Sequence, residues 1–238
     1  MSKGLDCATV CGQPDLTCFK VNYFQGGEET GFIGRYYAFN FKKRDANGDP
    51  TPLAKCLTVA EAKLISNNKF TIVAVYELRA GAKKKKDKKY HVDDFEYDKG
   101  TRDAEAAYTY ALNVIGQPKD SAIYFAVDYP APAYKTDLKA LVGYFTAVRR
   151  FFLATNDFYK VGVYGSGTVC STMATTNITV GKVTVPLAGF TWLADAAKWP
   201  GSAAYKTWNI KQGLQPPNWP CIPVDTDQGA AVIGDFVV

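Results

Sequence analysis

The segment Ser121–Tyr129, SAIYFAVDY, constrains the fold of this chain most strongly. Its centre, Ala122–Val127, is continuously apolar. A strand of this kind is typical of a parallel sheet that helices cover on both faces. The acid Asp128 follows the apolar run directly, and a carboxylate at that point needs partners or a raised pKa. The segment therefore predicts an α/β fold and marks Asp128 as a candidate functional residue.

Predicted strands and helices alternate along the rest of the chain. Thr58 and Glu61 form a capping box that opens a helix to about Asn67. Further helices are expected over 15–23, 101–115 and 136–156, and residues 45–52 are expected to be a turn-rich loop. The predicted strands are 4–8, 31–38, 70–77, 121–129, 160–164, 188–194, 207–212 and 222–225.

Eight strand candidates without a linker or an internal repeat favour one domain over residues 1–238. That length suits a (β/α)8 barrel, or TIM barrel, which takes about 250 residues. Helices between the last strands look short or missing, so the barrel is expected to be irregular. An open doubly wound sheet is the alternative architecture.

Composition limits the chemistry that the chain can perform. His91 is the only histidine, which excludes a zinc site built from several histidines. A Ser-His-Asp triad could use only this histidine, which follows a run of lysines. The 23 acidic residues leave carboxylate chemistry open. Nothing in the sequence calls for a metal or an organic cofactor.

The net charge of +5 is local. The segment Lys83–Lys89 carries six positive charges and one negative charge, so the remaining sequence sums to zero. This distribution argues against a nucleic-acid-binding face, which needs basic residues spread over a surface. The lysine segment is interpreted either as a solvated loop or as a patch that holds an anionic polymer or a membrane surface.

Cysteine usage leaves the compartment open. The six cysteines lie at 7, 11, 18, 56, 170 and 221. The spacing of Cys7, Cys11 and Cys18 suggests one local disulfide, whereas buried free thiols are the equally weighted alternative. No signal peptide and no transmembrane segment is visible. Disulfides would favour an oxidising compartment, so an extracellular or cell-wall-associated protein is expected.

Four acids lie at the ends of predicted strands, namely Asp6, Glu77, Asp128 and Asp225. In a TIM barrel the chemistry is located at the carboxyl ends of the strands, so these acids are expected to converge. Two carboxyl groups are what cleavage of a glycosidic bond needs. A helix cap or a surface charge is the alternative for each acid. Polar aromatic residues also occur in the predicted strands and near their ends, and they are interpreted either as core residues or as surfaces on which a ligand stacks. They are Tyr36, Tyr76, Tyr124, Tyr164, Trp192 and Trp208.

The ordered motifs resemble a known family. They are Gly4-Leu-Asp6-Cys-Ala-Thr9, Gly34-Arg-Tyr-Tyr37, Leu57-Thr-x-x-Glu61-Ala62, Val75-Tyr-Glu77, Ile123-Tyr-Phe-Ala-Val-Asp128, Gly162-Val-Tyr-Gly-Ser166 and Val224-Asp225. Together they resemble the glycoside-hydrolase-like family described as domain of unknown function 1906. That family is similar to the family-25 lysozymes, which are irregular TIM barrels that cleave peptidoglycan.

The resemblance implies a site for a polysaccharide around Asp6, Glu77, Asp128 and Asp225. In the lysozymes the fourth strand ends in Asp-x-Glu, whereas Pro130 replaces that Glu here. Glu77 is therefore the candidate acid, with Asp128 as base or electrostatic stabiliser and Asp6 orienting the sugar. The ligand-binding candidates are Asp225, Tyr36, Tyr164, Trp208 and Gln212.

Two functions follow. The first is a glycoside hydrolase that acts on a cell-wall amino-sugar polymer of the peptidoglycan or chitin type. The second is a catalytically inactive carbohydrate-binding protein on the same barrel, since a fold does not dictate an activity. A Glu77 side chain that is salt-bridged away, to Arg35 or Arg79, would favour the second function.

Overall fold

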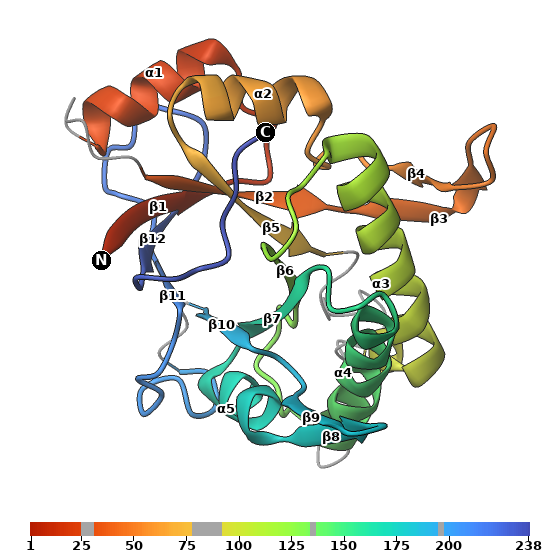
Figure 1. Cartoon of the computed structure of the whole chain (residues 1–238). Helices are drawn as coiled ribbons and strands as arrows, with labels where there is room; N and C mark the ends of the chain where they lie inside the picture. The colour runs from red at the N-terminus through yellow and green to blue at the C-terminus, as the bar shows by residue number, and fades with distance from the viewer. Residues whose placement is uncertain (25–30, 78–91, 134–136, 195–197) are drawn as a thin grey trace, which may run out of the picture.

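The protein is a closed eight-stranded barrel surrounded by helices. The computed structural model describes residues 1–24, 31–77, 92–133, 137–194 and 198–238. The strands follow one another around the barrel in the order β1-β12-β11-β10-β7-β6-β5-β2. Their bounds are β1 Ser2–Asp6, β2 Phe32–Tyr37, β5 Thr71–Tyr76, β6 Ala122–Ala126, β7 Lys160–Gly165, β10 Phe190–Leu193, β11 Ile210–Gly213 and β12 Asp225–Gly229. The expected irregular α/β barrel is therefore confirmed (Figure 1).

The last strand is the irregular one. β12 pairs antiparallel with both β1 and β11, while every other pair in the barrel is parallel. The prediction of a last strand over 222–225 was wrong, because β12 begins at Asp225. Because β12 runs in the opposite direction, Asp225 still lies at the end of the barrel where the parallel strands terminate. We call this end the carboxyl rim.

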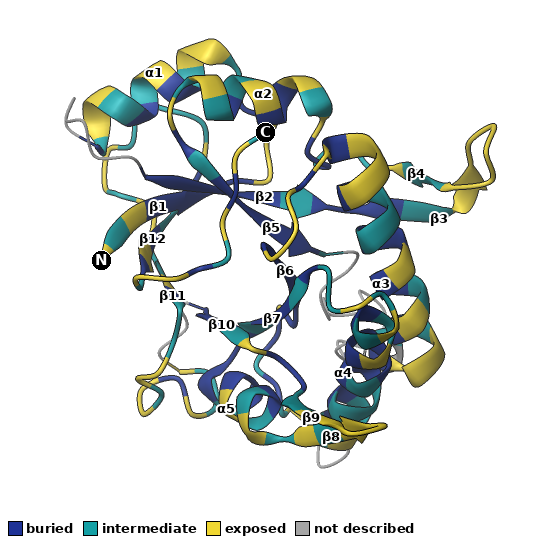
Figure 2. Ribbon diagram, in the orientation of Figure 1, coloured by how far each residue is buried: buried dark blue, intermediate teal, exposed yellow. Residues whose placement is uncertain are grey.

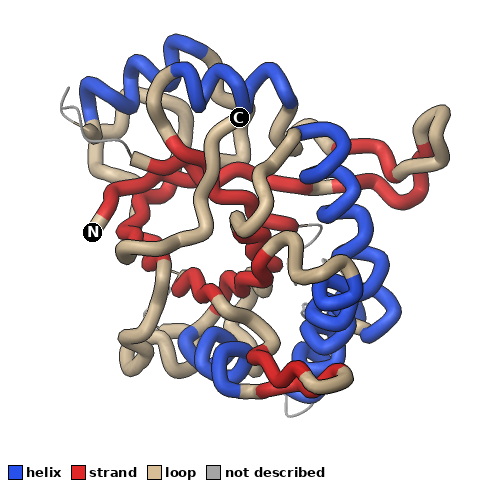
Figure 3. Tube along the Cα trace, viewed as in Figure 1, coloured by secondary structure: helices blue, strands red, loops and turns tan. Residues whose placement is uncertain are grey.

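The helices lie outside the ring of strands (Figure 3). They are α1 Gln13–Asn22, α2 Val59–Asn67, α3 Tyr97–Tyr110, α4 Asp137–Ala154 and α5 Gly167–Thr175, with a 3-10 turn η1 Val92–Phe95 and a π-helical turn η2 Ala111–Ile115. Thr58 caps α2 as predicted, and its side chain accepts a hydrogen bond from the Glu61 amide. Gly100 lets α3 approach α4 closely, since a Cβ atom there would lie 2.4 Å from the Tyr144 carbonyl oxygen.

The apolar core has two parts. A large cluster fills the space between the strands and the helices, which turn their buried faces inward (Figure 2). A smaller cluster fills the barrel itself and includes Val73, Tyr124, Trp192 and Ile210. The rim residues therefore lie above a floor of buried, packed apolar side chains inside the barrel.

Two hairpins lie outside the barrel. The segment 45–52, predicted to be a loop, is the turn and return strand of a hairpin formed by β3 Phe39–Arg44 and β4 Pro50–Pro52. The second hairpin, β8 Asn177–Val180 with β9 Val183–Pro186, follows α5. β3 starts two residues after β2 ends, so the first hairpin projects from the rim side of the barrel (Figure 1).

A buried ion pair holds the first part of the barrel to its helices. Arg35 of β2 and Glu61 of α2 form a bidentate pair with N···O distances of 2.8 and 3.2 Å. Arg35 also donates to the carbonyl oxygen of Cys7 and to that of Lys55. The Glu61 carboxylate accepts a further hydrogen bond from the Cys11 amide at 2.7 Å. The pair thus connects β1, β2, α2 and the segment that carries Lys55.

The cysteine pairing corrects the sequence-based expectation. Cys18 forms a disulfide with Cys221, 203 residues further along the chain, rather than a local bridge. This disulfide ties α1 to the segment before β12. Cys7, Cys11, Cys56 and Cys170 are buried free thiols, and the Sγ atoms of Cys7 and Cys11 lie 3.2 Å apart.

The ion pair generates a stability prediction. Glu61→Gln leaves the Arg35 guanidinium buried without its counter-charge, so we expect a loss of about 3–5 kcal/mol in the free energy of unfolding. Urea denaturation measures the change. Glu105→Gln is the control, because this exposed acid of α3 should change stability by less than about 0.5 kcal/mol. Equal stability of the two variants would contradict the role given to the pair.

Candidate functional site

The carboxyl rim brings most of the predicted site residues into one hydrogen-bonded network. Tyr36 donates to Asp6 Oδ1 at 3.3 Å. Gln212 Nε2 lies 3.0 Å from Asp6 Oδ2 and 3.3 Å from Asp225 Oδ2. Tyr164 in turn donates to Gln212 Oε1 at 3.0 Å. Residues predicted separately from different strand ends are thus in direct contact.

Asp6 is a buried carboxyl at the centre of this network. Its residue is 5% exposed, and a Cβ atom at Gly34 would lie only 2.7 Å from its side chain, so the glycine makes room for it. Burial is the main cause of a pKa of about 7 for Asp6, and the charge of Asp225, opposite it on β12, contributes to the rise. Hydrogen bonds from Gln212 and Tyr36 oppose that rise. Asp6 therefore changes its protonation state near neutral pH.

Asp227 is a functional candidate that the sequence reasoning missed. It is 1% exposed, and its Oδ1 accepts a hydrogen bond from the Trp192 indole at 3.0 Å. Its Oδ2 has no donor among the described residues other than the neighbouring Asp6 carboxyl. Burial and the Asp6 charge raise the pKa of Asp227 well above its usual range. Two acceptor-only carboxylates cannot hydrogen-bond, so we interpret Asp6 and Asp227 as a pair that shares a proton.

Glu77 follows β5, the strand next to β2 and its Tyr36, and forms a salt bridge with Lys55. The Lys55 ammonium also lies 4.6 Å from the centre of the Tyr36 ring, an arrangement that favours a cation. The sequence analysis named Arg35 and Arg79 as possible partners of Glu77. Arg35 instead pairs with Glu61, and Arg79 lies outside the described residues.

Asp128 is the rim carboxyl that solvent reaches most easily. It lies two residues beyond β6, and its residue is exposed. Loss of part of its hydration nevertheless raises the pKa of Asp128 to about 6, and the charges of Glu77 and Asp225 act in the same direction. The Lys55 ammonium acts in the opposite direction. Asp128 is thus an accessible acid whose pKa depends on the Lys55–Glu77 pair.

Some predicted residues lie elsewhere. Trp208 precedes β11 and lies at the amino end of the barrel, away from the rim. Tyr76 packs between the strands and the helices, and Tyr124 and Trp192 belong to the apolar cluster inside the barrel.

The sequence does hold a signal for Asp227. Side chains two residues apart on a strand point to the same face, so Asp227 could have been predicted to lie on the same face as Asp225. No local signal in the sequence identifies Lys55.

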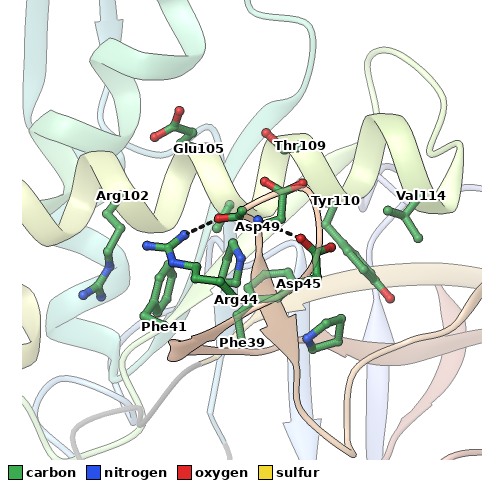
Figure 4. Close-up of a pocket in the computed structure, with 14 residues that line it drawn as sticks. Phe39, Phe41, Arg44, Asp45, Asp49, Arg102, Glu105, Thr109, Tyr110 and Val114 are labelled. Carbon is green, nitrogen blue, oxygen red and sulfur yellow. Dashed lines mark hydrogen bonds between the residues drawn. The ribbon is translucent and has the colours of Figure 1, made fainter.

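Two further features concern the possible binding of ions and small molecules. No group of three or more histidine, cysteine, aspartate or glutamate side chains within the described ranges is arranged to hold a metal ion. A pocket of about 520 Å³ lies outside the barrel, between the β3–β4 hairpin and α3 (Figure 4). None of the rim carboxyls lines this pocket.

The carboxyl pair predicts how stability depends on pH. Acids with a raised pKa in the folded state bind protons that the unfolded chain releases, so stability is greatest below about pH 4 for these groups and falls as pH rises towards about 7. Asp227→Asn removes one member of the pair, and we expect a smaller fall. Urea denaturation at pH 4.5 and 7.5 compares the variant with the wild type and with Glu105→Gln. Parallel profiles for all three proteins would refute the shared proton.

Comparison with solved structures gives the same fold. The Tat-secreted protein Rv2525c of Mycobacterium tuberculosis, solved in complex with HEPES, superposes with a TM-score of 0.66 over 98% of both chains at 17% identity. The spore cortex lytic enzyme SleM of Clostridium perfringens gives a TM-score of 0.56 at 15% identity, over 98% of this chain and 68% of SleM.

Comparison with curated sequences gives shorter matches. YbfG of Bacillus subtilis is 36% identical over 86 residues, which are 34% of this chain and 12% of YbfG. FadG of the same organism is 28% identical over 143 residues, which are 58% of this chain and 21% of FadG. The chain therefore corresponds to a small part of each of these relatives.

The family comparison covers most of the chain. The model of the Rv2525c-like, glycoside hydrolase-like domain matches residues 25–233, which include all barrel strands except β1. Because the match covers far more than half of the chain, the chain belongs to the Rv2525c-like family of glycoside hydrolase-like domains.

Proposed function

We propose that the carboxyl rim binds a cell-wall amino-sugar polymer of the peptidoglycan or chitin type and hydrolyses its glycosidic bonds. The observation that carries the proposal is the pairing of two unlike carboxyl groups. Asp128 is exposed and has a raised pKa, whereas its neighbour Glu77 is held by the Lys55 ammonium. Environments that separate two acids in this way are typical of an acid and a base in one active site.

These environments favour Asp128 as the proton donor and Glu77 as the base. Glu77 is engaged by the Lys55 ammonium in a salt bridge, whereas Asp128 is exposed, so Asp128 is the better placed of the two to meet a glycosidic oxygen. In the reaction, Asp128 protonates the glycosidic oxygen as the bond to the anomeric carbon breaks. Water adds its oxygen to that carbon, and its proton passes to Glu77. This order of roles reverses the one expected from the sequence.

The remaining rim residues support the sugar. Asp6 is buried beneath the exposed acids, so its part is to orient the ligand through Tyr36 and Gln212 rather than to exchange protons with it. Tyr164 and Asp225 complete the same network through Gln212. Trp208 would bind a sugar only at the other end of the barrel.

The second candidate function is a carbohydrate-binding protein without activity. The Lys55–Glu77 salt bridge favours it, because that bridge withdraws the acid that was expected to replace the missing glutamate at Pro130. The same Tyr36, Gln212 and Asp225 contacts would then hold the polymer without cleaving it.

An extracellular or cell-wall location fits either function. Rv2525c is described as Tat-secreted and SleM as a spore cortex lytic enzyme. The Cys18–Cys221 disulfide is typical of an oxidising compartment. In the part of the chain that the structure describes, no helix is long and apolar enough to cross a bilayer.

Hydrolysis predicts a specific effect of Asp128→Asn. We expect the variant to lose roughly 10²- to 10⁴-fold in the rate of cleavage of chitin and peptidoglycan fragments, measured as new reducing ends by mass spectrometry. In the wild type, kcat/KM should fall as pH rises above about 6, because the donor is then deprotonated. Wild-type protein that retains a polymer without cleaving it would support the binding protein instead.

Lys55→Met tests whether the Lys55 charge controls the pKa of Asp128, because a general loss of structure would reduce activity without shifting the pH profile. The Lys55 charge lowers the pKa of Asp128, so its removal should raise that pKa and move the fall of kcat/KM to higher pH.

Glu77→Gln should reduce cleavage, since the base is lost. Full activity of Glu77→Gln would eliminate Glu77 from the mechanism.

The lysine segment generates a separate prediction. Lys83–Lys89 lies outside the described residues, and we propose that it retains an anionic wall polymer near the site. Retention should then weaken as ionic strength rises, because salt screens exposed charges over about 8–10 Å. Cosedimentation with the polymer at low and high salt measures this, with a variant that has neutral residues at the six lysines as control. Salt-independent retention would contradict the proposal.

A further inference from the structure

The pocket between the β3–β4 hairpin and α3 has the properties of a second ligand site. Its volume of about 520 Å³ lies within the range of small-molecule sites, roughly 300–1,000 Å³. Tyr110 contributes an aromatic ring to it, Arg102 lies 4.1 Å from the centre of the Phe41 ring, and Phe39 is buried beneath them (Figure 4). Val114 belongs to the π-helical turn η2 and is 45% exposed, and such turns are frequent at functional sites.

The pocket combines these apolar surfaces with polar groups of both signs. Glu105 and Thr109 come from α3, while Arg44 and Asp49 come from the hairpin on the opposite side (Figure 4). The carboxylates only accept hydrogen bonds, and the guanidinium only donates them. An ionic ligand of either sign would be repelled by part of this lining. A neutral ligand rich in hydroxyl groups satisfies both kinds of partner, since each hydroxyl donates and accepts.

The chain connects this pocket with the rim at both ends of the hairpin. β3 begins two residues after Tyr37, the last residue of β2. The hairpin closes where the Leu53 amide donates to the Ala38 carbonyl at 2.8 Å, and Lys55 follows two residues later. The strand that supplies Tyr36 and the segment that supplies Lys55 are thus the two ends of the element that forms the pocket.

From the aromatic rings and the mixed polar lining, we infer that this pocket is an accessory binding site for a short, uncharged oligosaccharide, in addition to the rim. The choice of an amino-sugar oligomer as ligand rests on the proposed function. Sugar rings present apolar C–H faces to aromatic side chains and hydroxyl groups to Arg44, Asp49 and Glu105. The site would hold a second segment of polymer on the outer face of the domain.

Calorimetric titration with tri-N-acetylchitotriose tests the inference. The Asp128→Asn protein serves as the background, so that cleavage does not interfere. We expect two molecules of trisaccharide per chain. Adding Arg44→Ala and Glu105→Ala should weaken one of the two sites by at least about tenfold, the effect of losing about 1.4 kcal/mol. Both side chains are exposed, so these changes should leave the fold intact, which urea denaturation checks.

The outcomes separate this inference from the proposed function. Asp98→Asn is the matched control, since this exposed acid of α3 does not line the pocket and should preserve both sites. One site that survives Arg44→Ala and Glu105→Ala overturns the accessory site and leaves the rim function standing. One site that these changes abolish supports the accessory site and contradicts binding at the rim. No binding to any protein overturns both.

Discussion

The insertion of an antiparallel strand between β1 and β11 determines where the acids of the carboxyl rim lie. In an all-parallel barrel each strand contributes its final residues to the active end. β12 enters from that end instead, with Asp225 opposite Asp6 and Asp227 opposite Gln212. Two acids at successive inward positions of one strand therefore reach the same network. Asp227 lies a full step deeper in the barrel than the other rim acids, where no solvent reaches it.

Such burial is tolerable only because the charges are compensated locally. A buried carboxylate without a partner is costly, so burial raises the pKa of both Asp6 and Asp227, and the Trp192 indole donates a hydrogen bond to Asp227. The same Trp192 ring packs against Tyr124 in the floor below, with ring centres 5.6 Å apart. Packing of the floor and orientation of the acids are thus coupled through one side chain. On the outside of the same strands, the Arg35–Glu61 pair fixes the segments that follow β1 and precede Lys55.

Short sequence patterns predicted those helices and strands that are determined by residues close together in the chain. The apolar run Ala122–Val127 indicated β6, and the Thr58 capping box indicated the start of α2. The β12 sequence DTDQG has no apolar residue, because its inward positions lie at the polar rim, and so hydrophobicity could not identify it. The Cys18–Cys221 disulfide and the Lys55–Glu77 pair join distant segments that only the closed barrel brings together. Sequence spacing carries no information about such contacts.

Pro130 stands where the family-25 lysozymes have a glutamate, and under the proposed mechanism this difference does not by itself remove the capacity for acid catalysis. A proton donor requires a carboxyl that is accessible and that stays protonated near the working pH. Asp128 is exposed, and the loss of part of its hydration together with the Glu77 charge raises its pKa to about 6. Lys55 limits this effect and at the same time forms a salt bridge with Glu77. In the proposed mechanism, one lysine from outside the barrel strands thus pairs with one acid and lowers the pKa of its neighbour, so that the two carboxyl groups can take different roles.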